Sequence, residues 1–413
     1  MSGKVEMRKT KVGLIPIDWE VRKIEDISKN VFAGATPSTR NSEFWDGDIP
    51  WMSSGEINKK FIWDTEKKIT KEGFKSSSTK MVPKDSVLVA LAGQGKTRGT
   101  VAMNKIELCT NQSLASIVPN DTVYSKFLYY NLDSRYDELR KMSTGDGGRG
   151  GLNLKIINNI YIGLPPLLEQ KKVVNILSSW DKAIDLKVKL IEQKKEQKKG
   201  LMQKLLTGKV RLPGFKDKWE NKQIKDIAGI YLGLTYTPKY VSEGVPFLSV
   251  KDLDGDKLNF DNVKYISKEE YEDSTSNAKP KKGDILFGRV GTLGNPVILN
   301  EDIEFCIFVS LGFLRMKNHN VSNYFVKFWM QSDLFTRQVE AKVAGSSQKN
   351  LNTGWLKEFE IKLPHINEQA AIVNILLEID KEINLLEREL SLLKQQKKGL
   401  MQLLLTGKVR VRV

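Results

Sequence analysis

Two long stretches of the chain carry the apolar spacing of a coiled-coil helix. In residues 366–405, apolar side chains recur at alternating intervals of four and three, which places them in one narrow stripe along a helix. Residues 167–206 keep most of this stripe, but Lys187 and Lys194 interrupt it and predict a looser seam. We therefore predict two long helices that pair antiparallel, although helices of this kind can also pack against their own domains. The stripe consists of Val173, Leu177, Trp180, Ile184 and Ile191 in the first helix, and of Ile372, Leu376, Ile379, Ile383, Leu386, Leu390 and Leu393 in the second.

Both helices lie within an internal repeat. The Leu-Pro sequence at Leu164, followed by Glu-Gln, returns at Leu363, which is 199 positions later. Leu-Leu-Thr-Gly-Lys-Val-Arg begins at Leu205 and again at Leu404, with the same separation. Proline near the start of a helix and glycine just after its end are common boundary signals. A sequence that repeats once predicts a molecule with pseudo-two-fold symmetry.

Each helix follows a segment in which short β-type runs alternate with turns. Strands are expected at 87–91 and 284–287, and short helices at 125–132 and 322–331. The predicted fold class is α+β, with two similar α/β domains separated by two long antiparallel coiled-coil helices. The predicted division is 1–163 and 213–362 for the domains, and 164–212 and 363–413 for the helical spacers.

The charge balance indicates a polyanionic partner. The 413-residue chain has a formal net charge of +16 and a pI near 9.4, which favours nucleic acid, although lysines can also be solvated helix surface. No run approaches the roughly 18 apolar residues of a membrane span, and the first residues do not resemble a signal peptide. A cytoplasmic protein without membrane contact is therefore expected. Cys109 and Cys306 are interpreted as buried thiols.

Motifs for catalysis are weak. Residues 90–97 satisfy a relaxed phosphate-loop pattern, but the following sequence continues as a strand, whereas a phosphate loop needs a helix there. Residues 252–256 begin like a calcium loop, yet Lys257 replaces the glycine that such a loop requires. His319 and His365 are the only histidines, and neither has metal-ligand spacing. We expect no active site, no metal and no cofactor.

The loops of both domains combine aromatic, basic and amide side chains. Such groups hydrogen-bond to base edges and phosphates. The residues predicted to face DNA are Lys96, Thr97, Arg98 and Arg149 in the first domain, and Tyr236, Lys239, Arg289, Gln348 and Lys349 in the second.

The near identity of Lys-Lys-Gly-Leu-Met-Gln in both helical segments suggests two equivalent copies of one partner protein. The residues predicted to bind this partner occupy matching positions in the repeat. They are Glu169, Gln170, Lys198, Lys199, Leu201 and Met202, and Glu368, Gln369, Lys397, Lys398, Leu400 and Met401.

With its duplicated Leu-Pro starts, its repeated Leu-Leu-Thr-Gly-Lys-Val-Arg ends and its two divergent domains, the chain resembles the specificity subunit of type I restriction-modification systems. In that family the divergent domains are target recognition domains, and each reads one half of a split DNA sequence. The resemblance implies double-stranded DNA, two methyltransferase subunits and restriction subunits as partners, with catalysis carried out by those partners. A non-specific coiled-coil DNA adaptor and a phosphate-loop nucleotidase remain as alternatives.

Overall fold

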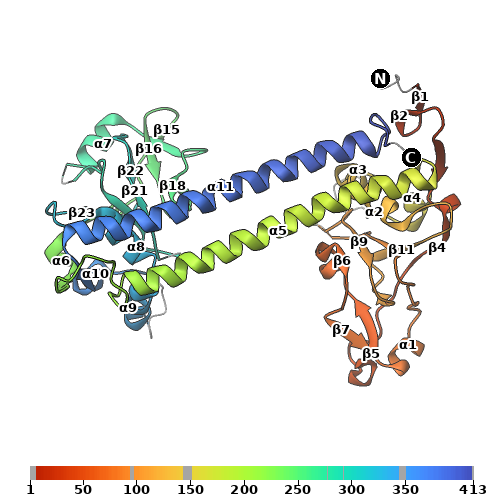
Figure 1. The fold of residues 1–413 in the computed structure, drawn as a ribbon, viewed down its shortest axis with the longest axis horizontal. Coiled ribbons are helices and arrows are strands. Elements are labelled where there is room, and N and C mark those ends of the chain that lie inside the picture. The colour runs from red at the N-terminus through yellow and green to blue at the C-terminus, as the bar shows by residue number, and fades with distance from the viewer. Residues whose placement is uncertain are drawn as a thin grey trace. The chain divides into compact units, whose positions relative to one another are not determined.

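The computed structural model describes residues 6–93, 97–142, 151–276, 278–291, 293–343 and 350–411. The chain divides into two compact units. Unit 1 comprises Met1–Lys187 together with Glu389–Val413, and unit 2 comprises Val188–Arg388. Each unit therefore contains one domain and parts of both long helices (Figure 1).

The two predicted long helices are confirmed. α5 (Leu167–Leu205) and α11 (Ile366–Leu404) have 39 residues each, which corresponds to about 58 Å of helix. Gly200 and Gly399 lie inside them, and a Cβ atom at either position would meet no other atom within 4 Å. Every residue of the predicted stripes is buried or half-buried, as a seam between helices requires.

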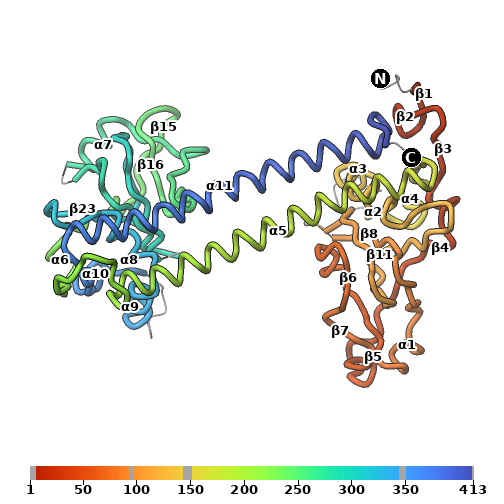
Figure 2. The backbone as a smooth tube through the Cα atoms, in the orientation of Figure 1, coloured from red at the N-terminus to blue at the C-terminus, as the bar shows by residue number. Residues whose placement is uncertain are grey.

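Within each unit the start of one helix packs beside the end of the other (Figure 2). In unit 1, Val173 and Leu177 of α5 share a core with Met401 and Leu404 of α11. In unit 2, the end of α5 lies beside the start of α11. Met202 and Leu205 of α5 share a core there with Ile372 and Leu376 of α11. These contacts confirm antiparallel pairing. The same cores also contain domain residues, so each helix end is anchored in a domain as well as in the seam.

The two lysines that interrupt the stripe of the first helix have acidic partners on the second helix. Lys187 Nζ lies 2.8 Å from a carboxylate oxygen of Glu389, and Lys194 Nζ lies 2.8 Å from one of Glu382. Both lysine side chains are about three-quarters buried, at 24% and 26% exposure. Their aliphatic stems can therefore cover the seam while their ammonium groups reach carboxylates on α11.

Unit 1 contains a mixed α/β domain. The larger sheet has the order β4-β11-β8-β9-β6, a smaller sheet has the order β10-β5-β7, and β1-β2 and β3-β12 are separate antiparallel pairs. The strands are β1 (Met7–Thr10), β2 (Gly13–Pro16), β3 (Glu20–Lys23), β4 (Ser28–Ala33), β5 (Trp45–Met52), β6 (Phe61–Ile62), β7 (Lys67–Ile69), β8 (Val87–Ala90), β9 (Val101–Asn104), β10 (Cys109–Thr110), β11 (Leu114–Pro119) and β12 (Tyr161–Leu164). The helices are α1 (Lys71–Lys75), α2 (Ser125–Asp133), α3 (Tyr136–Lys141) and α4 (Leu154–Asn158), with 3₁₀ helices η1 (Glu25–Ile27), η2 (Ser42–Phe44) and η3 (Ser54–Lys59).

Unit 2 contains a domain of related topology. Its sheets have the orders β14-β23-β20-β21 and β15-β19-β16-β22, and β13-β24 and β17-β18 are antiparallel pairs. The strands are β13 (Glu220–Gln223), β14 (Ala228–Leu232), β15 (Tyr240–Val241), β16 (Val245–Leu248), β17 (Leu253–Asp254), β18 (Lys257–Leu258), β19 (Lys264–Ile266), β20 (Ile285–Gly288), β21 (Gly294–Ile298), β22 (Cys306–Ile307), β23 (Leu311–Met316) and β24 (Glu360–Leu363). The helices are α6 (Ile224–Ile227), α7 (Lys268–Ser274), α8 (Asn323–Met330), α9 (Asp333–Val343) and α10 (Thr353–Glu358), with the 3₁₀ helix η4 (Val250–Asp252).

The cysteines occupy matching places in the two domains. Cys109 pairs with Trp51 in a parallel bridge between β10 and β5, and Cys306 pairs with Phe247 in the same way between β22 and β16. Both thiols are free and buried, as predicted, and burial raises the pKa of each to about 11. They are therefore protonated at neutral pH. Within the described part of the chain, no helix is long and apolar enough to cross a membrane.

Candidate nucleic-acid interface

A buried carboxylate joins the two sequence repeats in unit 1. Glu169, in the first turn of α5, is 1% exposed and accepts a hydrogen bond from Nε1 of Trp19 at 3.3 Å. The Arg410 guanidinium donates to both of its oxygens, at 2.7 and 2.8 Å. Arg410 also donates to Asp18 and thereby lowers the pKa of that carboxyl group. Arg410, six residues after the end of α11, therefore holds the start of α5 in place.

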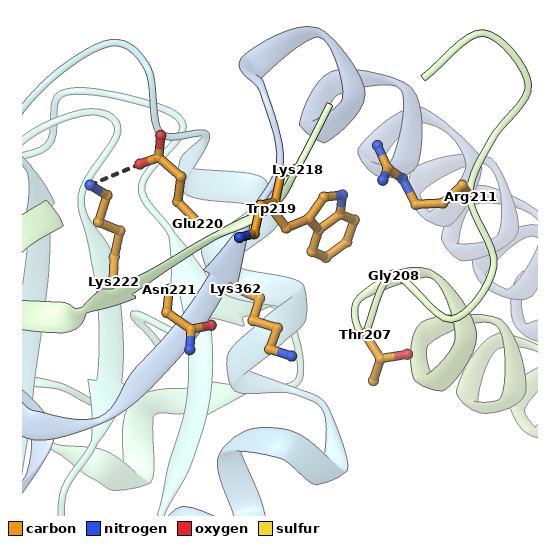
Figure 3. A pocket seen from close by; sticks show the side chains of 9 residues that line it. All are labelled: Thr207, Gly208, Arg211, Lys218, Trp219, Glu220, Asn221, Lys222 and Lys362. Carbon is orange, nitrogen blue, oxygen red and sulfur yellow. Dashed lines mark ion pairs between the residues drawn. The ribbon is translucent and has the colours of Figure 1, made fainter. Parts of the chain in front are cut away.

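Unit 2 has the same arrangement with the roles of the two helices reversed, because the arginine follows α5 and the buried glutamate begins α11. Glu368, in the first turn of α11, is 1% exposed and accepts hydrogen bonds from Arg211 at 2.7 and 2.8 Å and from Nε1 of Trp219 at 3.2 Å. An open pocket of about 900 Å³ lies beside this contact (Figure 3). It is lined by Thr207, Gly208, Arg211, Lys218, Trp219, Glu220, Asn221, Lys222 and Lys362.

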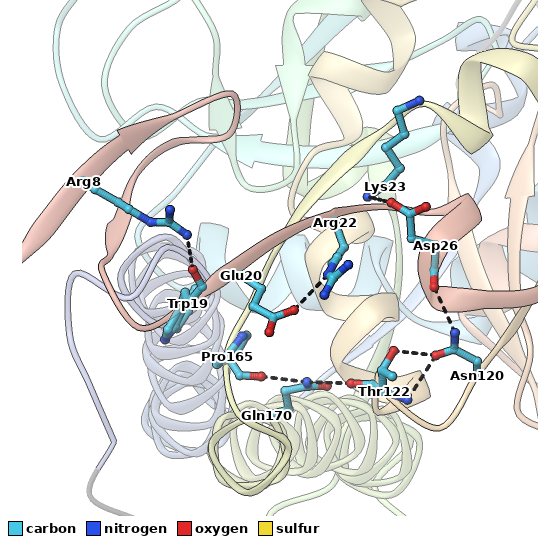
Figure 4. Close-up of polar contacts among 10 residues, drawn as sticks. All are labelled: Arg8, Trp19, Glu20, Arg22, Lys23, Asp26, Asn120, Thr122, Pro165 and Gln170. Atoms are coloured by element: carbon cyan, nitrogen blue, oxygen red, sulfur yellow. Dashed lines mark hydrogen bonds and ion pairs between the residues drawn. The ribbon is translucent and has the colours of Figure 1, made fainter.

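The neighbouring glutamines fasten each helix start to a domain loop. The Gln170 side chain donates to the carbonyls of Thr122 and Pro165 (Figure 4). It also accepts a hydrogen bond from the Tyr124 amide at 2.7 Å. Gln369 makes the corresponding three bonds in unit 2, accepting from the Ser322 amide and donating to the carbonyls of Asn320 and Pro364. In both repeats, the glutamate and the glutamine of this pair therefore make hydrogen bonds within the chain.

A second matched cluster in unit 1 centres on Asp181. Its Oδ1 pairs with the Lys397 ammonium, and its Oδ2 accepts a hydrogen bond from the Tyr130 hydroxyl at 2.5 Å. The Lys397 Nζ also lies 5.3 Å from the centre of the Tyr130 ring. Burial, and then the hydrogen bond to Asp181, raise the pKa of Tyr130 far above its usual value. The hydroxyl therefore remains a donor to the carboxylate.

The corresponding cluster in unit 2 lacks the hydroxyl group. Lys198 pairs with Oδ1 of Asp380 at 2.6 Å and lies 5.2 Å from the ring centre of Phe328, which occupies the place of the tyrosine. Oδ2 of Asp380 is buried and has no hydrogen-bond partner among the described residues. The same ion pair is thus fully satisfied in one unit and only partly satisfied in the other.

Exchanging these two aromatic residues should have opposite effects on stability. Tyr130→Phe should cost about 1–3 kcal/mol, because it leaves an oxygen of the half-buried Asp181 carboxylate without the hydroxyl donor. Phe328→Tyr should instead stabilise the protein, because it offers Asp380 the donor that it lacks. Denaturant unfolding of the full chain measures both changes. Equal losses from the two variants would contradict this explanation.

The remaining predicted partner-binding residues differ in exposure. Met202 and Met401 are buried, and Leu201 and Leu400 pack partly buried against the same cores. Their internal contacts, like those of the Glu-Gln pair, account for much of the identity between the repeats. Two members of the set are exposed, Lys199 and Lys398. Binding of a partner by the set remains a prediction.

Four of the predicted DNA-facing residues, namely Lys96, Arg149, Gln348 and Lys349, lie outside the described residues. In the first domain, Thr97 and Arg98 are half-buried in a turn between β8 and β9. These strands are antiparallel, with Val89 opposite Val101. The phosphate-like run is therefore followed by a returning strand, which is not the geometry of a nucleotide-binding loop.

In the second domain, the structure separates the predicted residues into two kinds. Tyr236 and Lys239 are exposed on the loop between β14 and β15, where the Tyr236 hydroxyl donates to Glu270 at 2.5 Å. Arg289 is half-buried, and its guanidinium donates to the carbonyls of Leu351 and Val309. Burial lowers the pKa of Arg289. Its described contacts hold the loop after β20 in place.

One loop that the sequence reasoning missed follows β4 in unit 1. Gly34 begins it, and a Cβ atom there would lie 1.8 Å from the Thr110 carbonyl oxygen, so only glycine fits. The Trp51 and Trp45 indoles donate to loop carbonyls at 3.0 and 3.1 Å. Gln112, from a neighbouring loop, is exposed and accepts a hydrogen bond from the loop hydroxyl of Thr36 at 2.6 Å. The result is a rigid loop that presents polar side chains to solvent.

The corresponding loop of unit 2 also begins with a glycine that packs against backbone. A Cβ atom at Gly233 would lie 2.2 Å from the Ile307 carbonyl oxygen, and Tyr236 follows three residues later. Gly34-Ala35-Thr36 and Gly233-Leu234-Thr235 have the same spacing as the helical repeat. This shared Gly-x-Thr pattern was the available signal for the first loop.

Metal-binding chemistry is not evident in these loops. Across the described ranges, no group of three or more His, Cys, Asp or Glu side chains is arranged to hold a metal ion.

Comparison with known proteins gives a consistent result. The family model described as "Type I restriction modification DNA specificity domain" matches twice, at residues 16–196 and 216–395. The type I restriction enzyme MjaVIII specificity subunit of Methanocaldococcus jannaschii is 28% identical over 96% of this chain and 94% of its own length. The MjaIX specificity subunit of the same organism is 30% identical over 60% of this chain and 61% of its own length.

Two solved structures resemble this one in fold. The S subunit of a type I restriction-modification system from M. genitalium aligns with a TM-score of 0.55 and 15% identity, covering 98% of this chain and 99% of that chain. A chain from a structural study of complex assembly and conformational transition of the type I R-M system aligns with a TM-score of 0.63 and 16% identity, covering 96% and 99%.

Proposed function

Because the chain belongs to the type I restriction modification DNA specificity family, which it matches in two copies, we propose that it selects the DNA target of a type I restriction-modification complex. Each domain reads one half of a split sequence in double-stranded DNA. The double match, over nearly the whole chain, is the observation that carries this proposal. The basic charge of the chain is consistent with a DNA partner.

The two domains are proposed to read different bases. The order β4-β11-β8-β9 in unit 1 corresponds to β14-β23-β20-β21 in unit 2, and both domains have a glycine-anchored loop, but the exposed residues at those loops differ. Gln112 lies at this loop in unit 1, whereas Tyr236 and Lys239 occupy it in unit 2. Unlike side chains form unlike hydrogen bonds with base edges, so the target should be asymmetric.

Two methyltransferase subunits are the proposed protein partners, with restriction subunits joining the larger complex and catalysis belonging to these partners. Equal binding sites require the same side chains to be exposed in both repeats. Leu186 and Leu385 meet this condition, at 57% exposure each, as do Val210 and Val409, at 47% and 45%. The other matched exposed residues are Lys199 and Lys398, Gln203 and Gln402, and Lys209 and Lys408.

Mapping of methylated adenines tests this proposal. The chain is expressed with its neighbouring methyltransferase subunit, and the host genome is read by single-molecule sequencing. A split, asymmetric motif that disappears without this chain is the expected result. A complex that forms but methylates no defined sequence would instead favour a non-specific DNA adaptor.

Gln112→Ala should alter one half-site only. If this side chain reads a base, its loss should reduce discrimination at one position by about 1–3 kcal/mol. The methylation motif would then become degenerate in the half read by unit 1 and stay unchanged in the other half. Gln338→Ala is a suitable control, because that amide is bonded to Leu334 and Glu360 within unit 2. An unchanged motif in the Gln112 variant would remove this residue from the reading surface.

A further inference from the structure

Two kinds of ion pair join the long helices. The first kind lies toward the helix ends and is the same in both repeats. Asp181 pairs with Lys397 in unit 1, and Asp380 pairs with Lys198 in unit 2. Since each helix carries both the aspartate and the lysine of this pair, two copies of α5 aligned in the same way would form it as well. The ion pairs Asp181–Lys397 and Asp380–Lys198 therefore stabilise the contact between two helices, but they do not distinguish α5 from α11 as the partner helix.

The second kind of ion pair lies nearer the middle of the helices and is not shared by the repeats. Lys187 pairs with Glu389 at 2.8 Å in unit 1. In unit 2, Lys194 pairs with Glu382 at 2.8 Å and Lys195 pairs with Glu387 at 2.7 Å. All three lysines are on α5, and all three glutamates are on α11.

Comparison of the two repeats shows which residues these lysines would face if α5 paired with a second copy of α5 instead of with α11. Subtracting the repeat length of 199 places Leu190, Ala183 and Val188 of α5 where α11 has its three glutamates. In a pair of α5 helices, the lysines would therefore face apolar side chains. Lys187 and Lys194, at 24% and 26% exposure, would lose their carboxylates in a partly buried seam.

A pair of α11 helices is disfavoured for the same reason. The positions of α11 that match Lys187 and Lys194 are Leu386 and Leu393, so Glu389 and Glu382 would face leucine. Lys394 matches Lys195, so only Glu387 would keep a lysine opposite it. Both leucines belong to the apolar stripe, and Leu386 is only 9% exposed. The apolar stripe alone cannot make this distinction, because both helices carry it.

We propose that the pairs Lys187–Glu389, Lys194–Glu382 and Lys195–Glu387 form a pairing code by which α5 selects α11 and rejects a second copy of itself. Charged residues at the edges of a coiled-coil seam set partner choice in this way. Because the two long helices share about half of their residues and the same apolar stripe, such a device prevents the repeats of different molecules from pairing with one another. This inference does not depend on the DNA sequence that the protein reads.

Complementary charge reversals in the full-length chain test the code. Variant A carries Lys187→Glu, Lys194→Glu and Lys195→Glu, and variant B carries Glu382→Lys, Glu387→Lys and Glu389→Lys. Each variant alone places like charges opposite each other, so its thermal midpoint should fall by about 5 °C or more. When A and B are refolded together, opposite charges meet only between the two chains. We expect a 1:1 heterodimer of twice the 46.9 kDa chain mass, measured by native mass spectrometry.

Two controls separate the code from general stability. The variant with all six reversals restores every pair within one chain, and it should be monomeric with a thermal midpoint close to that of the original chain. Asp181→Asn removes an end pair, and it should lower the midpoint without forming a heterodimer with variant B. The code is rejected if A and B stay monomeric with unchanged midpoints, if they form homodimers as readily as heterodimers, or if the six-fold variant is not restored.

Discussion

Replacement of Arg410 by methionine should destabilise unit 1 by about 3–5 kcal/mol, because it leaves the carboxylate of Glu169 buried without its positive partner. Glu169 is 1% exposed, and among the described residues it would retain only the Trp19 indole as a side-chain donor. Methionine keeps most of the aliphatic volume of arginine, so the loss reports mainly the charge. Hydrogen exchange of peptides from unit 1, followed by mass spectrometry, measures the local free energy of opening.

Two further variants define this effect. Arg211→Met should destabilise unit 2 to a similar extent, because Glu368 is equally buried and bound in the same way. Arg22→Met breaks an ion pair with Glu20 whose partners are 53% and 62% exposed, and it should change stability by less than about 0.5 kcal/mol. If Arg410→Met were as mild as the Arg22 variant, the contact with Glu169 would not be a major source of stability.

Leu186→Asp and Leu385→Asp should each remove one of the two methyltransferase subunits that we propose to bind. A large apolar side chain at the centre of an interface contributes about 2–4 kcal/mol, which corresponds to a weakening of roughly 30-fold to 1,000-fold. Native mass spectrometry of the complex should show one bound subunit for each single variant and none for the double variant. Because both leucines are 57% exposed, the chain itself should remain folded.

Leu392→Asp is the matched control for this experiment. Leu392 is 56% exposed on α11, yet its counterpart in the first repeat is Gln193, so it is not part of a surface common to both helices. Its variant should keep both subunits. Loss of both subunits from either single variant would contradict two independent, equivalent sites.

The long helices and their seam could be predicted because the apolar spacing extends over many turns and appears twice. The repeat extends into the domains as well, because Trp19 and Trp219 make equivalent contacts in the two units, as do Cys109 and Cys306. Such a signal survives in one sequence because a helical seam depends on residues that are close along the chain.

The partners of charged residues could not be read in the same way. Lys187 looked like an interruption because its carboxylate, Glu389, is 202 positions away in the sequence. Glu169 and Glu368 looked like surface residues because glutamate is usually exposed, and their arginines also come from the other repeat. Identity between repeats was therefore taken as a sign of an external partner, whereas the structure gives many of these residues an internal one.

Loop residues were the least predictable part of the candidate interface. The charge of Arg289 predicts a contact with DNA, but its described contacts are with backbone carbonyls. No sequence pattern indicates such contacts. Gln112 was overlooked because the hydroxyl that it contacts, on Thr36, belongs to a different loop 76 residues away.

Because unit 1 includes the end of α11, whereas unit 2 is one continuous segment, the two units become complete at different times during synthesis. Unit 2 is one continuous segment, Val188–Arg388, and can close as soon as that segment has left the ribosome. Unit 1 is started first, but it needs Met401, Leu404 and Arg410, which are made after all of unit 2. Until then, Glu169 has no arginine and part of the first core has no cover. Truncation of the chain after residue 388 would therefore destabilise unit 1, although it is synthesised first, and would leave unit 2 complete.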